Sequence, residues 1–388
     1  MRSKTMDPSC DMADESIPVF KYRNQSKNGG IHMNIPKTMK ALVARGQGQY
    51  GVEQIPVPVP GPGEILIKVE VCGICAGDVK ASHPVARFWG GDGMPGYCEP
   101  PFVPGHEFLG EIVAMGEGVS DEFKIGDRVI SEQVVPCGKC RYCKQGKYWL
   151  CEPHNVYGFK YYLNGGMAEY ALLPKGSLNF HVPKELTLEQ AALIEPYACA
   201  LHGVRQADPK VDDVVVLAGA GTLGLGMVGA LRLRNPKLLI VLDMEDSRLE
   251  LAKKFGADIV INPGKEDAVK KVMELTDGYG CDVYLEVTGH PSAVQQGLDM
   301  ICKGGTFLEF SVMSGTSTID WSIIGDAKEI TIKGSSLSGH CFDTTIENIL
   351  NGKAPTEGVV SHKFSLDQWE EAYRMAENRS AFKVVLIP

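Results

Sequence analysis

Four cysteines lie within one short stretch of the chain. Cys137, Cys140, Cys143 and Cys151 follow the spacing C-x2-C-x2-C-x7-C in the run PCGKCRYCKQGKYWLC. Thiolates so close together on one loop converge easily on a tetrahedral Zn²⁺, with every coordination position filled by protein, which is typical of a structural zinc site. The spacing therefore predicts a structural zinc loop over residues 136–152.

A second metal site is indicated by residues that are far apart in the sequence. Cys75 lies in VCGICAGD, His106 in PFVPGHEFLG and Glu195 in IEPYACALHG. A thiolate, an imidazole and a carboxylate from separate segments can form an open zinc site, in which water or substrate takes the remaining position. Taken singly, each residue is more often a buried thiol, a turn histidine or a surface carboxylate. Together they indicate catalytic zinc.

A glycine-rich turn follows the apolar run VVVLA. In Gly219-Ala220-Gly221-Thr222-Leu223-Gly224 the glycines would serve a tight turn, close approach to a pyrophosphate and close packing of helix on strand. Asp243 ends the next apolar run, where a carboxylate can accept from ribose hydroxyls and repel a 2′-phosphate. The pattern predicts a dinucleotide site and favours NAD over NADP. Arg248 could tolerate the phosphate, or be a solvated helix residue.

Bulk composition narrows the class of protein. The chain has 388 residues, 44% of them apolar, and a net charge of −9, which argues against nucleic acid as a partner. No run approaches the length of a membrane span. Twelve cysteines occur without a secretory signal, so we expect reduced thiols and a cytoplasmic protein. Residues 1–37 are polar, without sustained periodicity, and are predicted to be a flexible extension.

The rest of the chain shows two successive patterns of predicted secondary structure. Residues 40–186 read as strands broken by Gly and Pro. Thr187 and Gln190 form a capping-box pattern that opens a helix through ALIEPYACALHGV. After Pro209, six apolar strands alternate mostly with helices, which predicts a parallel sheet covered on both faces. Two helices and a strand, FKVVLIP, close the chain and are expected to pack back on the first part.

The chain resembles the zinc-dependent medium-chain dehydrogenase/reductase family, in the branch of polyol and threonine dehydrogenases. The resemblance covers about residues 40–388, through CGICAGD, GHEFLGEIVAMGEGV, the four-cysteine loop, EPYACALHGV, GAGTLG and FKVVLIP. It implies an α/β protein with a GroES-like, mainly β catalytic domain (38–196) and a Rossmann doubly wound parallel-sheet domain (197–338). Residues 339–388 would return to the catalytic domain.

The same resemblance assigns roles to single residues. Cys75 and His106 would be firm ligands of a catalytic zinc, while Glu107 and Glu195 compete for the third place. Asp78 would orient the histidine ligand, a common arrangement at zinc. Leu223 and Val287 would join the glycines at the cofactor. The implied cofactors are two zinc ions per subunit and NAD.

This sequence departs from the family pattern beside Cys75. Many relatives carry Ser or Thr two residues after the cysteine ligand, where Gly77 stands here, and often His five residues after it, where Lys80 stands. The usual proton relay is therefore in doubt. Lys80 or His83 could contribute to catalysis, or both could be exposed loop residues.

The resemblance implies hydride transfer from a secondary alcohol of a small polyol, such as erythritol or L-threitol, to NAD. An L-threonine 3-dehydrogenase, a sorbitol-type dehydrogenase and, outside the enzymes, a zinc-ribbon binding module are the alternatives. Aromatic stretches at 88–92, which ends in Asp92, and 157–162, which contains Lys160, would wall the substrate pocket or merely pack loops. Relatives usually form homodimers or homotetramers.

Overall fold

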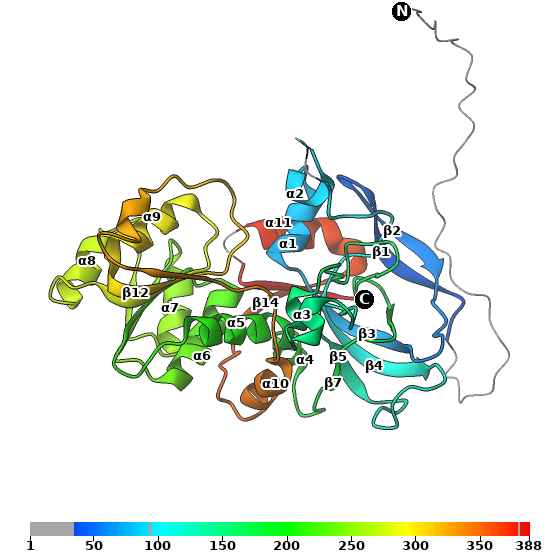
Figure 1. Cartoon of the computed structure of the whole chain (residues 1–388). Coiled ribbons are helices and arrows are strands. Elements are labelled where there is room, and N and C mark those ends of the chain that lie inside the picture. Colours follow the sequence, from blue (N-terminus) through cyan, green and yellow to red (C-terminus); the bar gives the residue numbers. More distant parts are fainter. Residues whose placement is uncertain (1–34, 92, 94, 379–380) are drawn as a thin grey trace, which may run out of the picture.

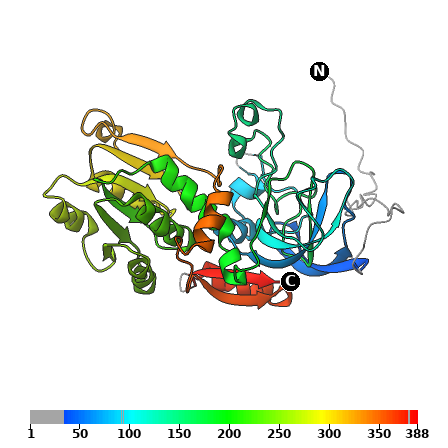
Figure 2. The same ribbon diagram turned by 90° about the horizontal axis from the view of Figure 1, so that it is seen from below.

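The computed structural model describes residues 35–91, 93, 95–378 and 381–388. The chain forms two β-sheet bodies that meet at helix α5 (Ile194–Ala207), which contacts strands of both sheets (Figure 1). Figure 2 shows the same division from below, with the end of the chain beside the body in which the described residues begin. Residues 1–34 of the predicted extension lie outside the described residues.

The first body contains a seven-stranded, mainly antiparallel sheet. Its order is β14-β15-β3-β4-β5-β7, with β6 also paired to β3, and β1 and β2 form a separate hairpin. The strands are β1 (Thr38–Gly46), β2 (Gln49–Pro56), β3 (Ile65–Gly73), β4 (Glu107–Met115), β5 (Arg128–Ser131), β6 (Tyr170–Leu173), β7 (Asn179–His181), β14 (Val360–Ser365) and β15 (Lys383–Ile387).

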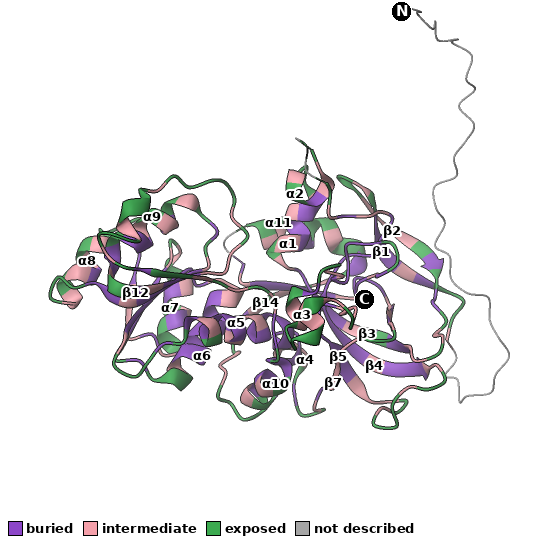
Figure 3. Ribbon diagram, viewed as in Figure 1, coloured by how far each residue is buried: buried purple, intermediate pink, exposed green. Residues whose placement is uncertain are grey.

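Strands β3 and β4 are buried on both faces (Figure 3). Val71 and Leu109 pack in the cluster that contains α5, whereas their neighbours Cys72 and Phe108 pack with Leu42 of β1. Because successive side chains of a strand point to opposite faces, this explains why both strands are nearly continuous apolar runs.

The second body is a six-stranded parallel sheet in the order β10-β9-β8-β11-β12-β13. Numbered by their place in this body, the strands run 3-2-1-4-5-6, the Rossmann order. They are β8 (Val214–Ala218), β9 (Leu238–Leu242), β10 (Ile259–Ile261), β11 (Cys281–Glu286), β12 (Ile301–Glu309) and β13 (Thr331–Gly334), and the helices between them are α6 (Thr222–Arg234), α7 (Asp246–Lys254), α8 (Ala268–Leu275), α9 (Pro291–Met300) and the short η2 (Trp321–Ile323).

Helices cover both faces of this parallel sheet. Val215 and Leu217 of β8 pack with residues of α6 and α7, while Val214 and Val216 pack with residues of α8 and α9. The sheet is therefore doubly wound, and the predicted α/β fold class is confirmed.

The predicted helix after Thr187 is divided in two. Its capping box is present, since Gln190 N donates to Thr187 Oγ1 at 3.3 Å and Thr187 N donates to Gln190 Oε1 at 2.9 Å. However, α4 (Leu188–Ala191) stops before α5 begins. Pro196 is the reason: it lacks the N–H that would bond Ala192 in one continuous helix, and proline is tolerated only in a first turn. Restarting at Ile194 places Pro196 there.

Several elements were not predicted from the sequence. Helix α1 (Ala76–Ser82) follows Cys75 directly, and α2 (Ala86–Trp89), α3 (Arg141–Lys144) and η1 (Tyr148–Leu150) are single turns. Strand β14 lies between the two predicted closing helices, which are α10 (Phe342–Leu350) and the single turn η3 (Leu366–Gln368) followed by α11 (Trp369–Glu377). Strand β15 pairs antiparallel with β3, with Val385 opposite Gly73. The last strand of the chain thereby reaches the end of β3 that precedes Cys75.

Candidate active site

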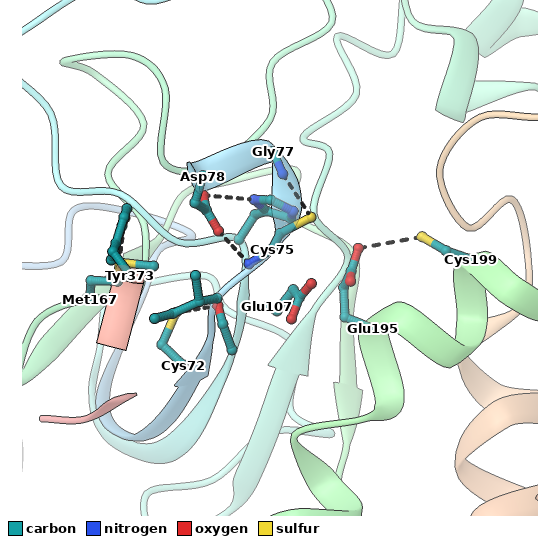
Figure 4. Close-up of polar contacts among 12 residues, drawn as sticks. Cys72, Cys75, Gly77, Asp78, Glu107, Met167, Glu195, Cys199 and Tyr373 are labelled. Atoms are coloured by element: carbon teal, nitrogen blue, oxygen red, sulfur yellow. Dashed lines mark hydrogen bonds and ion pairs between the residues drawn. The ribbon is translucent and has the colours of Figure 1, made fainter. Parts of the chain in front are cut away.

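The neighbouring strands β3 and β4 bring together the first group of possible metal ligands, Cys75, His106 and Glu107. Gly73 at the end of β3 is paired with Glu107 at the start of β4, so Cys75 just beyond one strand meets the residues that open the other. Ligand atoms of Cys75, His106 and Glu107 all lie within 4.8 Å of one another. His106 and Glu107 are buried and Cys75 is half-buried. The predicted convergence of Cys75 and His106 is thus present in the structure. Figure 4 shows Cys75, Asp78 and Glu107 close to one another.

Asp78 holds two of these residues. As part of the capping box of α1, its Oδ2 accepts from the backbone N–H of Cys75 at 2.9 Å. Its Oδ1 lies 3.5 Å from His106 Nδ1, and the Asp78 side chain is fully buried. Burial lowers the pKa of His106, but Asp78 and Cys75 outweigh it and hold that pKa well above its usual range. The imidazole is therefore surrounded by anionic groups.

A buried lysine completes the surroundings of Glu107. Lys383, the first residue of β15, forms an ion pair with Glu107 and donates to Ile74 O at 3.0 Å. Both side chains of the pair are 3% exposed. A Cβ on Gly73 would lie 2.2 Å from Glu107 Oε2 and 2.7 Å from Lys383 Cε, so only glycine leaves room for the pair. Lys383 was not identified from the sequence. The feature that could have indicated it is a lysine at the start of an otherwise apolar strand.

Glu195 lies beside this cluster but outside the group whose atoms are within 4.8 Å. It is buried in the first turn of α5, and Cys199 Sγ donates to its Oε1 at 3.4 Å. Burial, and then the charge of Glu107, raises the pKa of Glu195 to about 7. Of the two carboxylates that compete for the third ligand position, Glu107 is the one already placed among the other donors.

The donor set fits a zinc ion. A thiolate, an imidazole and a carboxylate from separate segments, with a further carboxylate close by, are the ligand types of open zinc sites. The buried negative charges around His106 are what a divalent cation would neutralise.

Lys80 and His83 are engaged elsewhere. Lys80 Nζ donates to Val312 O at 2.5 Å, in the loop after β12, so this side chain reaches from α1 to the parallel-sheet body. His83 Nε2 lies 3.2 Å from Glu377 Oε1 of α11. A catalytic part for Lys80 stays a prediction. Gly77 leaves open space, since a Cβ there would lie 3.7 Å from Cys75 Sγ.

The aromatic stretches pack largely against each other. Phe88 stacks on Phe159 with ring centroids 5.9 Å apart, and Phe159 lies 5.7 Å from the ring of His106. Lys160 is paired with Glu99 at 2.8 Å rather than free to bind a hydroxyl. Asp92 lies outside the described residues. Of these two stretches, Phe159 is the residue shown to contact the cluster.

The four-cysteine loop forms a second group of donors. The sulfurs of Cys137, Cys140, Cys143 and Cys151 lie within 4.8 Å of one another. Backbone N–H groups point at them: Cys140 N donates to Cys137 Sγ at 3.4 Å and Cys137 N to Cys151 Sγ at 3.2 Å. The N–H groups of Cys143 and Glu152 lower the pKa of Cys140 to about 6. Four thiols so arranged fit a closed, structural zinc.

The glycine turn opens α6 at the carboxyl end of β8. Gly219 has a φ of +108°, and a Cβ on Gly224 would lie 2.0 Å from Gly219 O, so these two glycines serve the turn and the close helix packing. A Cβ on Gly221 would meet only Arg248, at 3.9 Å. This open space at a helix N-terminus is what a phosphate requires.

Asp243 follows β9 and is fixed beside that turn. Its Oδ2 accepts from Ala220 N at 2.7 Å and lies 4.0 Å from Arg248 Nη1. Val287 packs against Gly219, 3.1 Å from the position of a Cβ there. Leu223 lies in the first turn of α6. The predicted cofactor residues are thus adjacent at one end of the parallel sheet, where doubly wound folds bind dinucleotides.

Comparison with known proteins agrees with this geometry. Residues 61–184 match the alcohol dehydrogenase GroES-like domain, and residues 222–351 match the zinc-binding dehydrogenase family model. The chain is 42% identical to the erythritol/L-threitol dehydrogenase of Mycolicibacterium smegmatis, over 91% of this chain and 99% of the relative. It is 37% identical to the L-threonine 3-dehydrogenase of Pyrococcus horikoshii, over 87% and 95%.

The fold is shared with solved structures. A putative zinc-binding dehydrogenase from Sinorhizobium meliloti, bound to NADP, superposes with a TM-score of 0.83 at 28% identity and covers 91% of this chain and 100% of its own. The chain is therefore an oxidoreductase of the zinc-binding dehydrogenases. It belongs to the zinc-dependent medium-chain dehydrogenase/reductase family, and the predicted resemblance is confirmed.

Two further expectations concern the whole chain. The eleven cysteines in the described residues form no disulfide with one another, and Cys10 lies outside that part. Among the described helices, none has the length and apolar character needed to cross a membrane.

Proposed function

We propose that this enzyme oxidises a secondary alcohol of a small polyol, of the erythritol or L-threitol type, to the ketose with NAD as acceptor. The observation that carries the proposal is the convergence of Cys75, His106 and Glu107 beside a dinucleotide fold. The substrate class rests on the relative from M. smegmatis, which is matched over nearly its whole length.

The cofactors supply the reactive chemistry. When bound, zinc acts as a Lewis acid on the substrate hydroxyl, and NAD accepts the hydride from carbon. Cys75 and His106 would hold the catalytic zinc, with Glu107 as the third ligand. Asp78 would keep the imidazole oriented through the 3.5 Å contact at Nδ1.

Proton removal falls to a carboxylate in this proposal, because Gly77 offers no hydroxyl. Glu107 and Glu195 are the buried carboxylates beside the cluster, and the raised pKa of Glu195 suits a group that must accept and return a proton near neutral pH. Lys383 would hold Glu107 in place through their ion pair.

The cofactor side of the proposal rests on Asp243 and Gly221. Gly221 leaves space for the pyrophosphate, and the carboxylate of Asp243 would accept from the adenosine ribose. Arg248 is already close to Asp243 and donates to Ala381 O at 2.9 Å, so it is not free to favour a 2′-phosphate. NAD is thus preferred to NADP.

We infer a division of labour between domains from the sheets. Residues 38–196 together with 339–388 would carry the metal chemistry, and 197–338 the cofactor. The free thiols fit a reducing cytoplasm, since zinc thiolates need reduced cysteines. A homodimer or homotetramer is proposed from the family resemblance, and light scattering of the purified protein would test it.

The test is NADH formation by the zinc-loaded protein across four- to six-carbon polyols, threonine and simple alcohols. Fastest turnover with a tetritol supports the proposal. Fastest turnover with threonine would favour the second candidate, an L-threonine 3-dehydrogenase, which rests on the 37% identity to the Pyrococcus enzyme. Preference for a six-carbon polyol would indicate a sorbitol-type enzyme.

A further inference from the structure

A chain of buried hydrogen bonds leads away from Glu195. Cys199 lies one turn further along α5, on the same face, and its thiol donates to Glu195 Oε1 at 3.4 Å (Figure 4). The thiol sulfur in turn accepts from Gln133 Nε2 at 3.1 Å. Gln133 follows β5 in the first body and is 1% exposed. Each donor in this chain therefore points toward the catalytic cluster.

The other end of the Gln133 side chain is also fixed. Its Oε1 lies 2.9 Å from Ser338 Oγ, and Ser338 is fully buried. Ser338 Oγ lies 3.2 Å from Glu132 Oε2, and Glu132 Oε1 accepts from Tyr148 OH at 2.6 Å. Tyr148 belongs to the four-cysteine loop. Because both ends of the amide are bonded, Gln133 is held in one orientation.

A buried amide is costly unless its hydrogen bonds are made, and an apolar side chain would fill the same space without that requirement. Glu195 is a buried carboxylate outside the Cys75–His106–Glu107 group, so its direction depends on the donor that holds it. Within the described residues, the Glu195 carboxylate accepts a hydrogen bond from the thiol of Cys199. Gln133 sets the direction of this thiol.

We propose that Gln133 is a positioning residue that acts through Cys199 to hold the Glu195 carboxylate toward the catalytic metal cluster. The inference rests on the proposed function only in taking the Cys75 cluster as the catalytic metal site. It predicts that losing Gln133 weakens retention of that metal and leaves the four-cysteine metal in place.

Retention of zinc under competition by a chelator tests the proposal without any substrate. Cys75→Ala identifies which of the two released zinc ions is the catalytic one. Gln133→Met keeps the length of the side chain but removes both hydrogen bonds. It should weaken catalytic-zinc affinity by about tenfold, the lower end for residues that support a metal ligand. The control is Ser131→Ala, whose buried hydroxyl lies 3.4 Å from Tyr157 OH and donates to the backbone carbonyl of Glu132, not to a side chain of this hydrogen-bond chain, and which should leave the affinity unchanged.

A double-mutant cycle separates positioning from a general loss of packing. If Gln133 acts through Glu195, Gln133→Met added to Glu195→Gln should weaken zinc retention no further than Glu195→Gln alone. Cys199→Ala interrupts the same chain of hydrogen bonds and serves as a second variant in case Gln133→Met folds poorly. It should also weaken zinc retention, and should weaken it no further when added to Glu195→Gln. Additive losses, or wild-type retention in Gln133→Met, would overturn the proposal. A failure to oxidise polyols would contradict the proposed function and leave this readout unaffected.

Discussion

Lys383 and Glu107 are oppositely charged side chains buried beside the catalytic cluster. A buried pair is weak evidence for stability, but removing one partner leaves an uncompensated charge in the interior. The glycine at position 73 leaves room for both side chains. The pair therefore fixes the place of Glu107 before any metal is bound.

Lys383→Met should lower the free energy of unfolding by about 3–5 kcal/mol, because the buried Glu107 would lose its oppositely charged partner. The matched control is Lys40→Met, whose partner Asp367 is 63% exposed, and which should cost less than about 1 kcal/mol. Urea unfolding measures both variants. Equal small losses would show that the buried pair is not needed, and adding Glu107→Gln to Lys383→Met should restore part of the stability.

Asp78 supports the cluster without being among its donors. Asp78→Asn keeps an oxygen for the Cys75 N–H but removes the charge beside His106. We expect the affinity for the catalytic zinc to fall about 10–100-fold, as for other residues that orient a histidine ligand. Zinc analysis after dialysis against graded chelator measures this. Unaltered affinity would mean that His106 is oriented by other contacts.

At the scale of elements, the turn between β8 and α6 assigns different roles to its glycines. Gly224→Ala would place a Cβ 2.0 Å from Gly219 O, forcing the helix from the strand and destabilising the fold. Gly221→Ala meets open space and should leave the unfolding free energy nearly unchanged, yet weaken NAD binding because the Cβ occupies the phosphate position. Calorimetric titration with NAD and urea unfolding separate the two effects. Wild-type NAD affinity in Gly221→Ala would place the pyrophosphate elsewhere.

The junction between β5 and the four-cysteine loop contains a fully buried carboxylate, Glu132. Burial raises its pKa from 4.5 to about 6, although Tyr148 and Ser338 bond it. Because the folded pKa is the higher one, the folded state binds the proton more tightly. This contribution to stability is complete below pH 4.5 and is lost as the pH rises through about 6.

Glu132→Gln removes this titration. Between those pH values the wild-type protein should lose up to about 2 kcal/mol relative to Glu132→Gln, at 1.36 kcal/mol per unit of pKa difference. Urea unfolding of both proteins at a series of pH values measures the difference, in which effects common to both cancel. A constant difference across the series would contradict the assigned pKa.

For the whole molecule, the sequence predicted features that depend on residues close together in the chain. The four cysteines and the glycine turn are short motifs whose spacing fixes their geometry, and strand–helix alternation predicted the parallel sheet covered on both faces. What it missed is non-local: Lys383 reaches Glu107 only because β15 pairs with β3, and Gln133 meets Cys199 only where the two bodies join. Helix α1 was missed because its cap is Cys75, a residue read as a ligand.

The proposed reaction requires the metal cluster and the dinucleotide to act on one substrate. The most direct measurement is NADH formation from erythritol and L-threitol by wild-type and Cys75→Ala proteins, each with its zinc content and NAD affinity determined. The wild-type protein should hold two zinc ions and form NADH, whereas Cys75→Ala should hold one, bind NAD and form none. Undiminished NADH formation by a Cys75→Ala protein that holds one zinc ion would contradict the central claim.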